Sequence, residues 1–114
     1  MKDDSVYIIH ICECIERIEQ YTEGGREFFL TDMKTQDAVL KNLHTLSEST
    51  QHLSPAMKSS HQEVDWRGIS GFLSILVHDY LGVNLVRVWE VVERELPDLK
   101  EKIHDIMQEL GLEF

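Results

Sequence analysis

Two side chains that could do chemistry, His78 and Tyr80, close a segment that is otherwise apolar, GFLSILVHDYLGVN. A histidine can take up and release a proton near neutral pH, and a tyrosine hydroxyl can accept a transferred group. The pair is therefore a catalytic fragment, a modification site or the polar end of a core helix. Periodicity alone favours the polar helix end, because the helix dipole stabilises a histidine near the C-terminus of a helix.

The remaining residues with chemical potential form no recognisable site. His44 and His52 would lie about 12 Å apart along a helix, which is too far for one metal ion. Cys12 and Cys14 are separated by one residue, so on a helix they point to different sides and favour neither a disulfide nor a two-thiolate metal site. The sequence contains no glycine-rich phosphate loop and no Gly-x-Ser-x-Gly motif. We expect neither a metal nor a cofactor.

Composition and charge limit the class of protein. The 114 residues fit one domain, 1–114, and 42% apolar with 28% charged residues is typical of a globular protein. The net charge of −10 argues against a broad basic surface for nucleic acid, but it leaves room for a small positive cleft between two subunits. No apolar run reaches the roughly 20 residues of a membrane helix, and the acidic start is unlike a signal peptide, so we expect a cytoplasmic protein.

Apolar residues recur every three or four positions along most of the chain, which predicts helices. The stretch REFFL is either a loop or a helical turn, and residues 55–64 are expected to connect two helices through one short helix. No strand pattern is present, so we predict an all-α bundle of four long antiparallel helices plus a short extra helix. The predicted helices run from Asp3 or Asp4 to Tyr21, from Thr31 or Asp32 to Ser54, from Trp66 to about His78, from Asn84 to Pro97, and onward from Pro97.

The predicted helix Trp66–His78 is apolar nearly all round, which is typical of a helix buried inside the molecule or between molecules. Gly68, Gly71 and Ser74 form a narrow stripe of small residues along it. Such a stripe lets another backbone approach closely, either within one bundle or at a subunit contact. The stripe alone does not favour one of these alternatives over the other.

Nearly the whole chain resembles the HepT-like family of HEPN-domain proteins. The most specific similarity lies in WRGISGFLSILVHDYLGVNLVRVWEVVERELPDLKEKI, while VYIIHICECIERIEQYT and QDAVLKNLHTLSEST resemble the family's first and second helices. The resemblance implies a single HEPN domain that forms an α-helical homodimer. It also implies a toxin that is paired with a minimal nucleotidyltransferase antitoxin.

The family's active motif is an arginine, four residues, a histidine, one residue and a tyrosine. The resemblance implies that the arginines and histidines of two subunits face each other and cut RNA, such as tRNA or mRNA, without a metal. Carried over to this sequence, His78 is the acid–base group and Tyr80 is the residue to which the antitoxin transfers AMP. Leu73 occupies the arginine position, Ser74 stands where the family commonly has asparagine, and Asp79 separates the histidine from the tyrosine.

The missing arginine predicts weakened catalysis. A guanidinium can hold two phosphate oxygens at once while charge builds on them, and leucine cannot. Losing such a group costs a factor of about 10²–10⁵ in rate. Arg67 lies eleven residues before His78, about three helical turns away, and cannot easily replace it. Leu73 is either natural to a weakened family member or an engineered replacement of a toxic residue, and both explanations stay open.

Three functions follow from these observations. The first is a HepT-like endoribonuclease toxin that is impaired at Leu73. The second is a catalytically inactive HEPN dimer that engages a nucleotidyltransferase or a nucleotide through His78 and Tyr80. The third is a plain structural helical dimer, which the retained sequence His78-Asp79-Tyr80 makes the least favoured.

Overall fold

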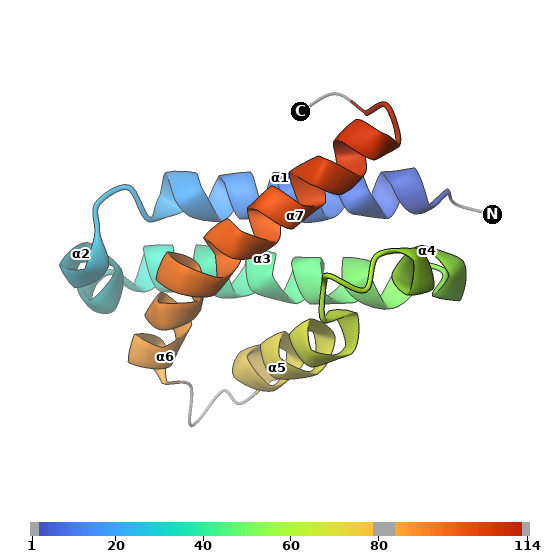
Figure 1. The fold of residues 1–114 in the computed structure, drawn as a ribbon. Helices are drawn as coiled ribbons and strands as arrows, with labels where there is room; N and C mark the ends of the chain where they lie inside the picture. Colours follow the sequence, from blue (N-terminus) through green and yellow to red (C-terminus); the bar gives the residue numbers. More distant parts are fainter. Residues whose placement is uncertain (1–2, 79–83, 113–114) are drawn as a thin grey trace.

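The computed structural model describes residues 3–78 and 84–112, which form a bundle of helices (Figure 1). Successive long helices run antiparallel, and no strand occurs in the described residues. The all-α prediction is confirmed, with a second short helix beside the expected one. The long elements are α1 (Asp4–Tyr21), α3 (Met33–His52), α5 (Trp66–His78) and a composite of α6 (Leu85–Glu90), a π-helical turn (Val91–Glu95) and α7 (Leu96–Glu109), and the short helices are α2 (Arg26–Thr31) and α4 (Pro55–Ser60).

Each long segment begins at a side chain that accepts a hydrogen bond from the first helical turn. The caps of α1 and α3 are Asp3 and Asp32, which accept the backbone N–H groups of Ser5 and Thr35. Asp65 accepts the N–H of Gly68 at the start of α5 at 3.1 Å, and Asn84 caps α6 in the same way. The predicted helix starts are therefore confirmed. Gly82, a helix-breaking residue shortly after the predicted third helix, lies outside the described residues.

The core lies where α1, α3 and α7 meet. Isoleucines from α1, Val39, Leu43 and Leu46 from α3 and apolar residues of α7 are buried together. The REFFL stretch is helical, because it forms α2 and buries Phe29 against Trp89 of α6, with ring centroids 5.6 Å apart. None of the helices that the structure describes is long and apolar enough to cross a membrane.

Pro97 does not start a separate helix but follows a π-helical turn inside a continuous one. Proline lacks an N–H group and its ring collides with the carbonyl four residues earlier. In this chain the turn Val91–Glu95 widens the helix, and the N–H of Leu96 reaches back five residues to the carbonyl of Val91. The widened turn therefore accommodates Pro97 without separating α6 from α7.

The corner between α4 and α5 is fastened to the far end of α7 by His61. The imidazole is buried, with Nδ1 2.9 Å from the carbonyl of Met57 and Nε2 3.0 Å from a carboxylate oxygen of Glu109. Its backbone carbonyl accepts the indole N–H of Trp66, the first residue of α5. A doubly protonated ring can donate to both partners, so the hydrogen bond to Met57 and the nearby Glu109 raise the pKa of His61.

We predict that this contact makes stability depend on pH. Because the pKa of His61 is raised in the folded state, its contribution is complete below about pH 6.5 and is lost as the pH rises through the folded value. Thermal unfolding of wild type and His61→Gln from pH 5.5 to 8.5 should show a difference that shrinks with pH. The decrease should be at most about 1 kcal/mol, since the Glu109 side chain is 66% exposed.

Glu109→Gln is the matched control, because it keeps a hydrogen-bond acceptor and removes the charge. It should flatten much of the same pH dependence. A wild-type minus His61→Gln difference that grows between pH 6.5 and 8.5 would contradict the assignment.

Candidate active site

Helix α5 positions the sequence-predicted site residues. His78 is its last residue, and Leu73 lies five residues earlier. Asp79 and Tyr80 lie outside the described residues, as do the side chains of Ser74 and His78. The backbone of α5 is held on α3, where the hydroxyl of Ser47 donates to the carbonyl of Ser70 at 3.2 Å.

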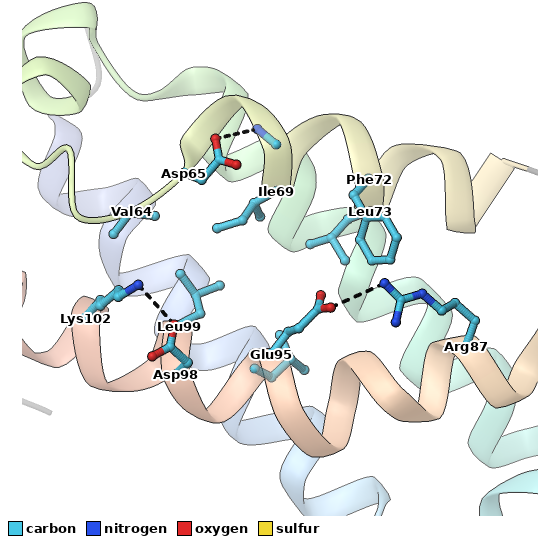
Figure 2. A pocket seen from close by; sticks show the side chains of 12 residues that line it. Val64, Asp65, Ile69, Phe72, Leu73, Arg87, Glu95, Asp98, Leu99 and Lys102 are labelled. Atoms are coloured by element: carbon cyan, nitrogen blue, oxygen red, sulfur yellow. Dashed lines mark hydrogen bonds and ion pairs between the residues drawn. The ribbon is translucent and has the colours of Figure 1, made fainter.

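Leu73 is buried, with 3% of its surface exposed. It lines a pocket of about 310 Å³ between α5 and the composite helix α6–α7. In Figure 2, Ile69, Phe72 and Leu73 point from α5 toward Arg87 and Glu95 on the facing helix. Position 73, where the resemblance predicts the family's arginine, is therefore an apolar pocket wall in this chain.

Both basic residues of this pocket, Arg87 and Lys102, are paired with carboxylates. Arg87 donates to Glu90 at 2.8 Å and to Glu95 at 3.4 Å, and its guanidinium carbon lies 4.8 Å from the centre of the Phe72 ring. Lys102 forms an ion pair with Asp98 at 3.0 Å. A cation paired in this way is a weak ligand for a phosphate, so Arg87 does not simply replace the missing arginine.

Arg87 was not predicted as a site residue, although it lies beside Leu73 in space. Two signals in the sequence could have found it. It follows a helix break by a few residues, and an antiparallel return brings the start of the next helix back toward the end of α5. Its neighbour at three residues, Glu90, also suits an ion pair on one helix face.

A second, wider hollow lies on the opposite face of α5. We call it the Lys58–Arg67 groove, an open space of about 1040 Å³ that extends from α4 to the first half of α5. At about 100° per residue, the groove positions of α5 lie roughly 180° from those that line the Leu73 pocket. The groove is lined by Lys58, Ser59, Gln62, Val64, Asp65, Trp66, Arg67, Ser70 and Gly71.

The two glycines of the small-residue stripe have different roles. A Cβ atom on Gly68 would overlap the carboxylate of Asp65, which caps α5. A Cβ atom on Gly71 would meet nothing within 4 Å. Gly68 therefore makes room for the cap, while Gly71 faces open space in the groove rather than a helix packed within the bundle.

Other candidate chemistry finds no support in the described part of the chain. Both cysteines are free and buried, and burial together with Glu16 raises the pKa of Cys12 to about 11, so its thiol is protonated at neutral pH. His10 and Cys14 lie four residues apart on α1 without a third ligand nearby. Among residues 3–78 and 84–112, no group of three or more His, Cys, Asp or Glu side chains could hold a metal ion.

Comparison with known proteins adds the chemistry that this geometry leaves open. Residues 11–106 match the sequence model of a family described as "Ribonuclease HepT-like". The match includes all of α3 and α5 and most of α1 and α7. No solved structure matches the chain.

Three curated proteins illustrate the similarity. The chain is 37% identical over 110 residues to a protein of Methanocaldococcus jannaschii named "Gamma-glutamylcyclotransferase and putative RNase", which covers 96% of this chain but only 50% of that relative. It is 36% identical to "Probable ribonuclease HepT" of Thermococcus cleftensis, over 88% of this chain and 92% of the relative. It is 31% identical to a "Putative RNase" of Caldanaerobacter subterraneus, over 95% and 97%.

We predict that Gly71→Ala stabilises the fold and that Gly68→Ala does not. Alanine is favoured over glycine inside a helix by about 0.5–1 kcal/mol, and at Gly71 nothing opposes the added methyl group. At Gly68 the methyl group displaces the Asp65 cap, whose loss costs about 1 kcal/mol and offsets the gain. Urea unfolding of both variants at one protein concentration measures the difference.

The pair also tests whether a second subunit packs closely on α5. If Gly71→Ala lowers stability, and does so more at high protein concentration, where a dimer would be populated, then another chain covers Gly71 in solution. That result would contradict the open environment of Gly71.

Proposed function

This chain belongs to the HepT-like ribonuclease family, and from that premise we propose that it is a HepT-like toxin component with a weakened ribonuclease site. His78 acts as the acid–base group, Tyr80 is the site of AMP transfer, and Leu73 stands where the activating cation is missing. The observation that carries the proposal is the family match over residues 11–106, which spans the His-x-Tyr half of the motif.

The proposed reaction is metal-independent RNA cleavage by attack of a 2′-hydroxyl on the adjacent phosphate. A histidine can take the proton of the hydroxyl or deliver one to the leaving oxygen. A cation must stabilise the charge that develops on the phosphate oxygens. In this chain the second requirement is the deficient one, because Leu73 is apolar and Arg87 is already paired with two carboxylates.

A homodimer is part of the proposal. Positions 73 and 78 lie about 140° apart around α5, so one helix cannot easily direct both at the same phosphate. Two α5 helices related by a two-fold axis can do so, because one subunit supplies position 73 and the other supplies position 78 to the same phosphate. The half-buried Ile69, Phe72 and Leu76 support such a contact, since α5 packs mainly on α3 and keeps apolar surface at its edges.

A second candidate function rests on the burial of Leu73. A leucine that closes the wall of a pocket contributes to the fold, which favours an inactive HEPN dimer that binds a nucleotidyltransferase or a nucleotide. A protein that binds a nucleotidyltransferase can also cut RNA, so partner binding does not distinguish the two proposals. RNA cleavage does, because only the first proposal predicts it.

We predict that Leu73→Arg raises RNA cleavage by on the order of 10²-fold or more. The Leu73 pocket is open and is lined by Glu95 and Asp98, so the new guanidinium is not buried without a partner. We therefore expect a folded protein that loses about 1–3 kcal/mol of stability. Cleavage of a fluorogenic RNA and the thermal midpoint, measured on the same preparation, check the result.

Two further variants sharpen this test. Glu95→Gln, combined with Leu73→Arg, prevents the carboxylate from capturing the new guanidinium, while Arg87 keeps its shorter bond to Glu90. His78→Ala, combined with Leu73→Arg, should abolish the gained activity. A folded Leu73→Arg protein that stays inert with and without Glu95→Gln would refute the ribonuclease proposal and leave the binding function.

We also predict that a partner nucleotidyltransferase with ATP transfers AMP to Tyr80. Tyr80 is the tyrosine two residues after the candidate histidine. Tyr7 stacks on His52 with ring centroids 5.2 Å apart, and Tyr21 is 39% exposed at the end of α1. Peptide mapping should place the added mass on Tyr80, and Tyr80→Phe should prevent it.

Tyr21→Phe is the matched control for this experiment, because it removes an exposed tyrosine outside the motif. Its modification should equal that of wild type. AMP on Tyr21, or on Tyr7, would overturn the assignment.

A further inference from the structure

The two hollows that flank α5 differ in how their cations are used. In the Leu73 pocket both basic residues, Arg87 and Lys102, form ion pairs with carboxylates of the same pocket. In the Lys58–Arg67 groove, neither the Lys58 nor the Arg67 side chain makes a hydrogen bond or an ion pair with a residue of the described chain. The one carboxylate of the groove, Asp65, already caps α5.

The groove therefore presents two uncompensated cations on a protein whose net charge is −10. It also offers neutral polar groups, the amide of Gln62 and the hydroxyl of Ser70, beside these cations. Lysine and arginine together with amide and hydroxyl donors are the groups that hold phosphate and sugar oxygens of nucleic acids. The floor at Gly71 has no side chain, which lets a strand approach the helix closely.

The register of α5 connects the groove with the motif histidine. Positions 67, 71, 74 and 78 are spaced by four, three and four residues, so they lie on one stripe of the helix. The stripe runs about 16 Å from Arg67 to His78, a length that a few nucleotides of a single strand can span. Leu73 lies on the opposite face, about 120° from Arg67.

The groove offers no platform for stacking bases. Trp66 is its one aromatic residue, and the ring is buried, with 6% of the residue exposed and its indole N–H bonded to His61. Proteins that read bases in single strands commonly stack them on exposed aromatic rings. The groove therefore suits the phosphodiester backbone, with little dependence on base sequence.

We propose that the Lys58–Arg67 groove binds the phosphodiester backbone of single-stranded RNA and leads the strand along α5 toward His78. This inference rests on the proposed function, since it concerns how the same substrate reaches the same site. Arg67 acts here as a positioning residue and makes no contact with the reacting phosphate. The groove fixes where a strand lies, whereas the motif decides whether it is cut.

The test measures binding rather than cleavage. A fluorescein-labelled 12-nucleotide RNA with 2′-O-methyl sugars cannot be cut, and anisotropy titrations at 50–200 mM salt give its affinity. Each phosphate contact on a single strand contributes about 0.7 to the slope of log affinity against log salt. Lys58→Gln with Arg67→Gln should lower that slope by about 1.4, so the wild-type affinity falls roughly sevenfold more than that of the variant over this range.

Lys34→Gln with Lys41→Gln is the matched control. Both lysines are exposed on α3, neither lines the groove, and the double variant has the same net charge as the groove variant. We expect the control to keep the wild-type slope, and Gly71→Leu, which fills the floor without changing charge, to weaken binding. The two charge variants should keep the wild-type thermal midpoint, and Gly71→Leu should not lower it.

An equal decrease of the salt slope in the groove variant and the control would indicate general charge attraction and would overturn the proposal. A groove variant with the wild-type slope would overturn it as well. Wild type that does not bind the RNA at all refutes both this inference and the proposed function. Groove-dependent binding without any cleavage by Leu73→Arg would sink the catalytic proposal and leave the groove standing. Cleavage by Leu73→Arg with wild-type binding in the groove variant would overturn the groove alone.

Discussion

The attachment of α5 to α3 is the interaction on which the candidate site depends. The helix that carries the motif packs mainly on α3, where the Ser47–Ser70 hydrogen bond joins the two helices. Its first turn is anchored through Trp66 and His61 to the end of α7. Because α5 is supported along one side, two hollows remain beside it, one apolar with paired charges and one polar with uncompensated cations. A bundle that enclosed α5 completely would have neither.

The sequence predicts the helices well because their signals are local. Asp32 and Asn84 cap the helices that were expected to begin there, Asp65 caps the helix expected from Trp66, and Gly24 and Gly25 separate α1 from α2. These signals depend only on which residues follow within one turn. The environment of Leu73 could not be predicted in this way. Its pocket is formed by Arg87, Glu95 and Leu99, residues far along the chain that meet α5 only after the composite helix folds back.

The π-helical turn is a second feature that local sequence signals do not predict. Pro97 indicates a break in regular α-helix, either a restart or a kink at that residue. A wider turn before the proline solves the same steric problem without ending the helix, and local propensity does not distinguish the two solutions. The turn matters for the Leu73 pocket, because Arg87 precedes it and Glu95 is its last residue. Their side chains form an ion pair, with a guanidinium nitrogen 3.4 Å from a carboxylate oxygen.

Under the two proposals, the groove and position 73 lie on different faces of α5, and this separation explains how catalysis can weaken while RNA binding remains. RNA binding along positions 67, 71, 74 and 78 of α5 would require small or polar residues, with positive charge at one end. Position 73 instead faces the Leu73 pocket. Arg67, about 16 Å from His78, can attract and orient an RNA strand. At that distance it cannot stabilise the charge that develops on the reacting phosphate. In these proposals, leucine in place of an arginine at position 73 removes stabilisation of the transition state and leaves the electrostatic attraction of the groove unchanged. Under the proposed function, a family member with leucine at this position still holds RNA while cutting it slowly.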